Sequence, residues 1–158
     1  MKTLIAYTTN HGCTEKCAMK VKMQLNQDTE LLDLKHSRSI DLNKYETIVI
    51  GGSIHAGRIQ NRVKKFCQQN LELLRSKKVG LFLCCMEEGE TAEKQFINAF
   101  PGELIQHSSA RGIFGGEFNF ERMNFIEKTI IKKVAKVDQN ISKIDENSIA
   151  EFVRAIEQ

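Results

Sequence analysis

Apolar residues along the chain follow two patterns in alternation, which predicts alternating strands and helices. Short runs of apolar, often β-branched residues predict strands, and between them apolar residues recur every three or four positions, as on one face of a helix. The predicted strands cover residues 3–8, 30–34, 47–52 and 79–85, with a last, interrupted strand over 104–107 and 110–117. The predicted helices begin near Cys13, Ile59 and Ala92, cover Glu121–Val137, and begin again at Ser148.

This order of elements predicts an α/β fold with helices on both faces of a parallel sheet. The runs at 47–52 and 79–85 are apolar on both faces, as strands are when helices cover both sides of their sheet. Helices follow most of the strands, which is the pattern of crossover connections. With 158 residues, one proline and no repeat, the chain is expected to form a single domain over residues 1–158.

The predicted helix Glu121–Val137 combines an apolar stripe with a lysine face. The stripe consists of Met123, Ile126, Ile130, Val134 and Val137, and the opposite side carries Phe125, Lys128, Lys132 and Lys136. A basic face with an exposed aromatic residue fits contact with anionic lipid, and a solvated lysine face is the alternative. In the last helix, Ser148 followed by Glu151 matches a capping box, which predicts Ser148 as the N-cap.

Net charge and cysteine content narrow the class of protein. A net charge of +3 is too small to indicate nucleic-acid binding. The five cysteines, an odd number, fit reduced thiols packed as small hydrophobic residues better than a disulfide framework. Cys13 and Cys17 are four residues apart, but no histidine or second cysteine pair joins them at zinc spacing, so no metal site is predicted. No leader or membrane span is recognisable, so a cytoplasmic location is expected.

The segment that links the first strand to the first helix has the composition of a phosphate-binding loop. Thr8, Thr9, Asn10, Gly12 and Thr14 offer hydroxyl groups, an amide and a glycine turn. The helix that follows would direct free backbone N–H groups and its positive dipole end at this loop. The loop has no lysine or arginine, so the sequence leaves open a plain strand–turn–helix connection with no ligand.

Ligands in open parallel sheets gather at the carboxyl ends of the strands, and three predicted loops meet there. The loops cover residues 9–13, 53–58 and 86–90. They lack the acidic cluster of a receiver domain, the Gly-x-Gly-x-x-Gly of a dinucleotide fold and the Gly-Lys-Ser/Thr of a P-loop. A cysteine phosphatase would place an arginine shortly after Cys13, and none is present. The interpretation that remains after these exclusions is a neutral phosphate-binding loop with two further loops beside it.

Two segments resemble the flavodoxin family. Residues 7–15, YTTNHGCTE, resemble its hydroxyl-rich phosphate loop, and residues 49–58, VIGGSIHAGR, resemble its third strand and flavin-ring loop. Gly-Ser-Ile-x-x-Gly followed by a basic helix is similar, more narrowly, to the flavodoxin-like menaquinone-dependent protoporphyrinogen oxidases. The resemblance covers nearly the whole chain, and it implies a five-stranded sheet in the order 2-1-3-4-5 with non-covalently bound FMN.

The resemblance also implies which residues contact the cofactor. The phosphate would be held by Thr9, Asn10, His11, Gly12, Cys13 and Thr14, and the ring bordered by Ser53, Ile54, His55, Ala56 and Gly57 on one side and by Cys85, Met86, Glu87, Glu88 and Gly89 on the other. Neither ring loop contains an aromatic carbocycle, so His55 is the nearest substitute for a stacking residue. A glycine at 57 would permit a peptide flip beside the flavin. The three glutamates Glu87, Glu88 and Glu90 would favour a low potential if they lie near the ring.

Three functions follow from this resemblance. The first is an FMN-dependent electron carrier, which would meet a redox partner protein. The second is an enzyme similar to the protoporphyrinogen oxidases, passing electrons to a quinone at the membrane. Such an enzyme would contact the inner face of the membrane peripherally through Glu121–Val137. The basic charge balance favours this second group, whereas the short acidic segment 86–91 replaces its long basic insertion. The third is an interaction module without flavin.

Overall fold

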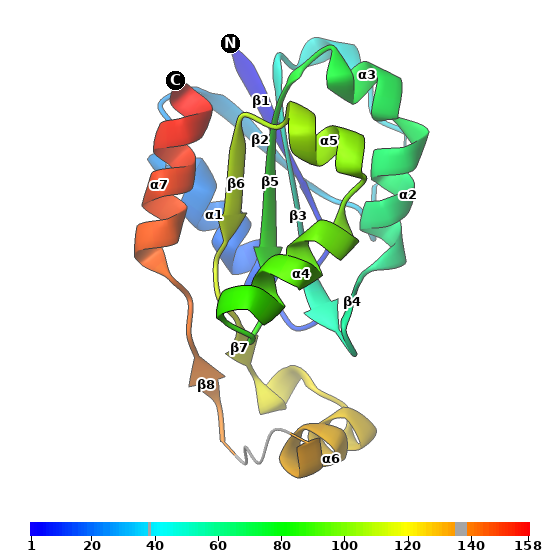
Figure 1. The fold of residues 1–158 in the computed structure, drawn as a ribbon, viewed down its shortest axis with the longest axis vertical. Helices are drawn as coiled ribbons and strands as arrows, with labels where there is room; N and C mark the ends of the chain where they lie inside the picture. Colours follow the sequence, from blue (N-terminus) through cyan, green and yellow to red (C-terminus); the bar gives the residue numbers. More distant parts are fainter. Residues whose placement is uncertain (38, 135–138) are drawn as a thin grey trace.

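The computed structural model describes residues 1–37, 39–134 and 139–158, which form three layers around a central sheet (Figure 1). The parallel strands follow the order β2-β1-β3-β5-β6, and β4 extends the sheet as an antiparallel partner of β3. The strands are β1 (Lys2–Tyr7), β2 (Asp28–Asp33), β3 (Thr47–His55), β4 (Arg58–Ile59), β5 (Lys78–Cys84) and β6 (Ala110–Ile113). The five parallel strands confirm the predicted order 2-1-3-4-5, and β4 is an addition to it.

Helices cover both faces of the sheet, each over its own hydrophobic core. The helix α1 (Cys13–Gln24) and the C-terminal helix α7 (Glu146–Glu157) bury one face. The other face is covered by α2 (Asn61–Gln69), α3 (Leu71–Arg75), α4 (Gly89–Ala99) and α5 (Gly102–His107), with the short helix η1 (Leu42–Lys44) in the connection to β3. Leu42 and the central strands are buried as their apolar patterns predict.

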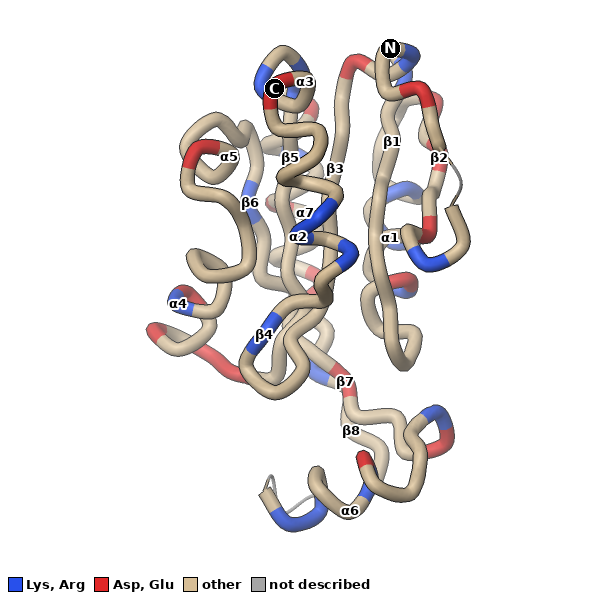
Figure 2. The backbone as a smooth tube through the Cα atoms, turned by 90° about the vertical axis from the view of Figure 1, so that its right-hand side faces the viewer, with Lys and Arg blue, Asp and Glu red and all other residues tan. Residues whose placement is uncertain are grey.

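A second, smaller unit extends below the carboxyl ends of the strands (Figures 1 and 2). We call residues 116–134 and 139–143 the arm. Two short antiparallel strands, β7 (Glu117–Phe118) and β8 (Ile141–Ser142), form its base. Between them lie the short helix η2 (Phe120–Arg122) and the helix α6 (Phe125–Val134). None of the described helices is both long and apolar enough to cross a membrane.

The prediction of the last strand is wrong in its first part and too long in its second part. Residues 104–107 belong to the helix α5, because Pro101 and Gly102 start a helical turn in which the N–H groups of Leu104 and Ile105 donate to the Pro101 carbonyl. The last parallel strand is only β6, and the chain enters the arm from Gly116 onward. Apolar composition does not show that the segment before the predicted interruption is helical.

Three element boundaries also differ from the predictions. Ile59 lies in β4 instead of opening a helix, and the helix that follows is divided into α2 and α3 at Asn70. The N-cap of α7 is Asp145, whose carboxylate accepts from the Ser148 N–H, so the prediction of Ser148 as the cap is wrong. The predicted helix Glu121–Val137 begins later, at Phe125, and its positions Lys136 and Val137 lie outside the described residues.

Candidate functional site

The loop between β1 and α1 leaves polar groups without partners. Gly12, with φ of 95°, precedes α1, and no side chain caps the first turn of that helix. The Gly12 N–H donates to the Thr9 hydroxyl over 2.8 Å, which closes the turn. The hydroxyl oxygens of Thr8 and Thr14 are buried and have no hydrogen-bond partner among the described residues. Uncapped N–H groups and orphaned hydroxyls are the donors that a phosphate group accepts from.

The arm places a cation over this loop. A Cβ atom added at Gly12 would lie 2.6 Å from Nη1 of Arg122, so the guanidinium group rests directly on the glycine. Arg122 and Gly12 also line one small surface cavity together with Lys16. The loop has no cationic side chain of its own, and the arm supplies one from more than a hundred positions later in the chain. Sequence reasoning missed Arg122, because its place is set by the arm alone.

A cavity of about 280 Å³ lies next to this loop, at the carboxyl ends of β3 and β5. It is close to the lower end of the size range of small-molecule sites. All three predicted loops contribute to it, with Thr9, His11 and Cys13, with Ser53, Ile54, His55 and Ala56, and with Cys85 and Met86. The structure therefore brings together nine of the sequence-predicted residues around one space.

The remaining predicted residues lie outside the lining of this cavity. Asn10 is exposed, Gly12 contacts Arg122, and Thr14 is buried in the first turn of α1. Gly57, Glu87, Glu88 and Gly89 are exposed at the ends of their loops. The Glu88 carboxylate lies 4.0 Å from the Lys143 ammonium group in the arm. Glu87 and Glu88 therefore face solvent and do not line the cavity.

The other side of the cavity consists of arm residues that the sequence did not indicate. They are Gly116, Glu117, Phe118, Met123, Glu127, Ile130 and Ile131. Phe118 supplies the aromatic ring that both predicted ring loops lack. Met123 and Ile130 belong to the apolar stripe of the predicted helix, and this stripe was the available indication that the segment covers something apolar.

Two histidines and a glutamate connect the loops to the arm. The His11 Nε2 atom lies 2.6 Å from the Glu127 carboxylate, and the rings of His11 and His55 meet edge-on with centroids 5.4 Å apart. His55 also contacts the Ser53 hydroxyl, which accepts a hydrogen bond from the Gln60 amide. Burial, and then the neighbouring His11, lower the pKa of His55. A neutral imidazole is therefore favoured at the edge of the cavity.

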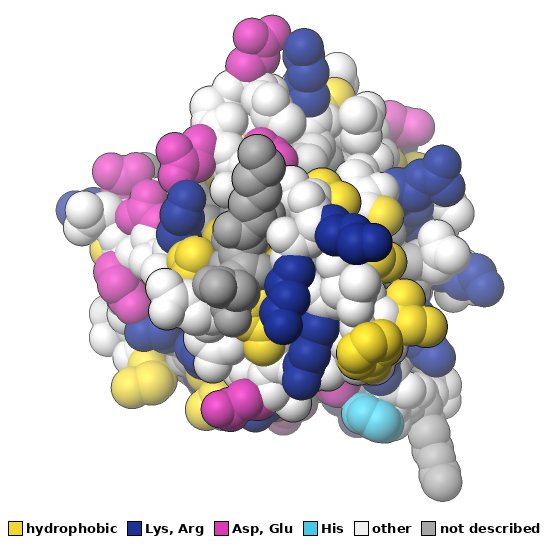
Figure 3. All heavy atoms as spheres, turned by 90° about the horizontal axis from the view of Figure 1, so that it is seen from below, with side chains coloured by type: hydrophobic (Ala, Val, Ile, Leu, Met, Phe, Trp, Pro, Cys, Tyr) yellow, Lys and Arg dark blue, Asp and Glu magenta, His cyan; other side chains and the backbone are white. Residues whose placement is uncertain are grey.

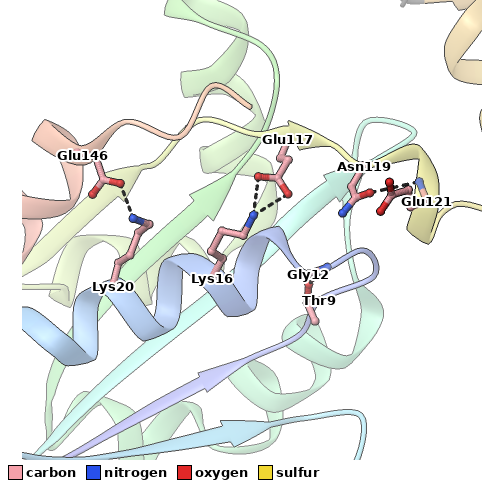
Figure 4. A network of polar contacts seen from close by, with 8 residues as sticks. All are labelled: Thr9, Gly12, Lys16, Lys20, Glu117, Asn119, Glu121 and Glu146. Carbon is pink, nitrogen blue, oxygen red and sulfur yellow. Dashed lines mark hydrogen bonds and ion pairs between the residues drawn. The ribbon is translucent and has the colours of Figure 1, made fainter. Parts of the chain in front are cut away.

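The helix α1 carries two further ion pairs that position the arm and α7 (Figure 4). Lys16 contacts both carboxylate oxygens of Glu117, at 3.0 and 2.9 Å. One turn along, Lys20 contacts Glu146 at the start of α7. The same helix that presents the phosphate loop therefore also holds the base of the arm.

These features fit FMN as the ligand of the site. The orphaned hydroxyls of Thr8 and Thr14 and the uncapped start of α1 suit a terminal phosphate, with Arg122 as a counter-charge. The adjacent cavity, lined by Phe118, Met86 and other apolar side chains, suits a planar ring. A phosphate site and a ring site side by side are what one FMN molecule requires.

Comparison with known proteins gives a consistent result. Residues 4–145 match the family model described as flavodoxin domain. A curated relative, protoporphyrinogen IX dehydrogenase (quinone) from Leishmania major, is 23% identical over 145 residues, which cover 86% of this chain and 63% of that protein. The chain thus spans less than two thirds of the length of that relative.

Solved structures agree with the fold. Oxidised flavodoxin 1 from Bacillus cereus superposes with a TM-score of 0.56 at 14% identity, covering 99% of this chain and 97% of that one. A WrbA-like flavodoxin protein from Agrobacterium tumefaciens gives a TM-score of 0.57 at 17% identity, covering 99% and 95%. At these identities the likeness concerns the fold alone.

Proposed function

Because the chain belongs to the flavodoxin domain family, we propose that it binds FMN non-covalently and transfers electrons through it. The observation that carries the proposal is the pair of orphaned, buried hydroxyls of Thr8 and Thr14 at the uncapped start of α1, beside the cavity on which three loops converge. When bound, FMN supplies one- and two-electron redox chemistry, and the protein sets its orientation and exposure.

The residues of the chain have distinct tasks in this proposal. The first turn of α1 and the threonine hydroxyls hold the phosphate, and Arg122 neutralises part of its charge. Phe118 and Met86 exclude water from the ring. The neutral His55 leaves the cavity without a fixed positive charge from that side chain. Gly57 has φ of 76° and open space around it, so its peptide is free to change orientation.

Titration of the apoprotein with FMN and with riboflavin tests this proposal. We expect quenching of FMN fluorescence at one equivalent and weaker binding of riboflavin, which lacks the phosphate. Arg122→Gln is expected to lower FMN affinity about tenfold, because a charge-assisted hydrogen bond contributes roughly 1.5–3 kcal/mol and this side chain is exposed. Riboflavin affinity should not change in this variant.

The matched control is Arg154→Gln, which removes an exposed arginine from the far end of α7. This control should leave both affinities unchanged. A protein that takes up neither flavin would contradict the proposal and favour the interaction module. Equal losses of FMN and riboflavin affinity in Arg122→Gln would contradict the role of Arg122 at the phosphate.

A second candidate function is a quinone-linked oxidation of a porphyrinogen, and the surface of α6 favours it. Phe125 is 83% exposed and Val134 is 78% exposed, next to the solvent-facing side chains of Lys132 and Lys133. Seen from below, basic and hydrophobic side chains lie side by side on the same face of the molecule (Figure 3). Such a surface matches the interface of an anionic membrane, where a quinone acceptor resides.

Two assays separate this candidate from a soluble carrier. The FMN-loaded protein would be tested for oxidation of protoporphyrinogen with and without a quinone, and for sedimentation with vesicles. The enzyme predicts quinone-dependent turnover and binding to vesicles with anionic lipid, weakened in the variant Phe125→Ser with Lys132→Gln. Neutral vesicles are the control. Absence of turnover, together with reduction or oxidation by a partner protein, would identify a carrier.

A further inference from the structure

Three cysteine thiols converge under the phosphate loop. The Sγ atoms of Cys13, Cys17 and Cys84 all lie within 4.8 Å of one another. Cys13 and Cys17 are one turn apart on the face of α1 that packs on the sheet, and Cys84 is the last residue of β5. All three are buried, with Cys17 fully so. The fold therefore adds a third donor from a distant strand to a pair that the sequence alone left without partners.

The neighbouring cysteines show that this convergence is not general in the molecule. Cys85 follows Cys84 in sequence but packs in the core on the other face of the sheet. Cys67 is buried in that same opposite core, in α2. Neither belongs to a group of three or more possible metal-ligating side chains among the described residues. Packing alone accounts for Cys67 and Cys85, whereas three sulfur donors within 4.8 Å of one another also form a possible chelating set.

The donor set and its spacing select the kind of ion. Sulfur ligands select soft cations. A trigonal ion with bonds of about 2.3 Å to sulfur holds its ligands about 4.0 Å apart, and none of the distances between these Sγ atoms exceeds 4.8 Å. Zinc in structural sites takes four ligands, and the group among the described residues offers three.

The surroundings of the cysteine cluster favour binding of a cation and allow it to enter from the cavity. Cys13 is the first residue of α1, where the helix dipole stabilises a thiolate ligand. Cys13 and Cys84 also line the cavity, while Cys17 lies deeper. An ion can thus reach two of its ligands from the cavity before it contacts the third.

We propose that Cys13, Cys17 and Cys84 form a three-coordinate site for one thiophilic monovalent cation, Cu(I). Binding replaces thiol protons, which are released to solvent, and involves no change in the oxidation state of sulfur or copper. All three ligands of the ion come from the chain, and Cys13 and Cys84 also line the cavity in which we place the flavin ring.

Titration of the reduced protein with Cu(I) under anaerobic conditions tests the proposal. A chromogenic Cu(I) chelator serves as competitor, and the titration is run with and without added FMN. We expect one Cu(I) per chain, with three sulfur neighbours in X-ray absorption. Cys13→Ser, Cys17→Ser and Cys84→Ser should each lower the affinity at least tenfold. Cys67→Ser and Cys85→Ser are the matched controls and should retain the affinity of the parent protein.

A second measurement keeps the test independent of whether each variant folds. Bound Cu(I) should protect Cys13, Cys17 and Cys84 of the parent protein from alkylation, read by mass spectrometry of its peptides, relative to the copper-free protein. Protection confined to Cys67 or Cys85, or Cu(I) binding that persists in the triple serine variant, would overturn the proposal. Tight binding of Zn(II) in place of Cu(I) would overturn the choice of ion.

Discussion

The central sheet β1–β6 and the helices on its two faces form the part of the molecule that we call the sandwich. The sandwich and the arm differ in how far their apolar residues are buried. In the sandwich, Phe82, Phe114 and Phe152 pack against one another, with the rings of Phe82 and Phe114 stacked at a centroid distance of 4.9 Å. In the arm, no residue of α6 is buried, and Phe125 is mostly exposed. The arm is joined to the sandwich by ion pairs such as Lys16–Glu117. The comparison teaches that an apolar periodicity predicts a helix but not what the helix packs on.

The largest expected difference between the two regions lies in the free energy of unfolding. Phe82→Ala should lower it by about 3–5 kcal/mol, because it leaves a cavity among fully buried aromatic rings. Phe125→Ala, the matched change in the arm, should alter it by no more than about 0.5 kcal/mol. Urea unfolding followed by circular dichroism measures both. Similar losses in the two variants would show that the arm shares the core of the sandwich.

The sandwich could be predicted from the sequence because its elements carry their own pattern. The doubly apolar strands β3 and β5 indicate a sheet covered on both faces, and the stripe of Ile149, Phe152 and Val153 in α7 indicates a helix with one buried face. Prediction from the sequence failed where a buried apolar residue belongs to a short helix, as Leu104 does in α5. There the structure depends on Pro101 and on packing beneath α3, and neither gives a periodic pattern.

The candidate site also has one part that could be predicted from the sequence and one part that could not. The three loops were predictable, because the carboxyl ends of parallel strands must meet at one edge of the sheet. Arg122, Phe118 and Glu127 were not predictable, because their positions depend on how the arm folds back. The thiol cluster was half visible as Cys13 and Cys17, and only the packing of α1 on β5 reveals Cys84.

A smaller loss of stability is expected from a change at the start of α7, where the chain passes from the arm back into the sandwich. Asp145→Ala removes the N-cap of α7, whose carboxylate accepts from the N–H and the hydroxyl of Ser148. The loss should be about 1 kcal/mol of unfolding free energy. Ser148→Ala leaves the backbone bond intact and should cost less. A larger loss in Ser148→Ala, measured by thermal unfolding, would restore Ser148 as the cap and contradict Asp145.

The smallest expected effect is a change in the pH dependence of the melting temperature. It concerns His55, which lies where the sandwich meets the arm. Its pKa is lowered, first by burial and then by His11, while Glu127 opposes the shift. Between this lowered pKa and the unfolded value of about 6.5, the unfolded chain binds more protons than the folded one. The stability contribution of the neutral imidazole is therefore lost as pH falls through that window. The melting temperature should thus decrease less on acidification in His55→Gln than in the parent protein. Identical pH profiles for the two proteins would mean that burial at the junction of the sandwich and the arm does not change the protonation of His55.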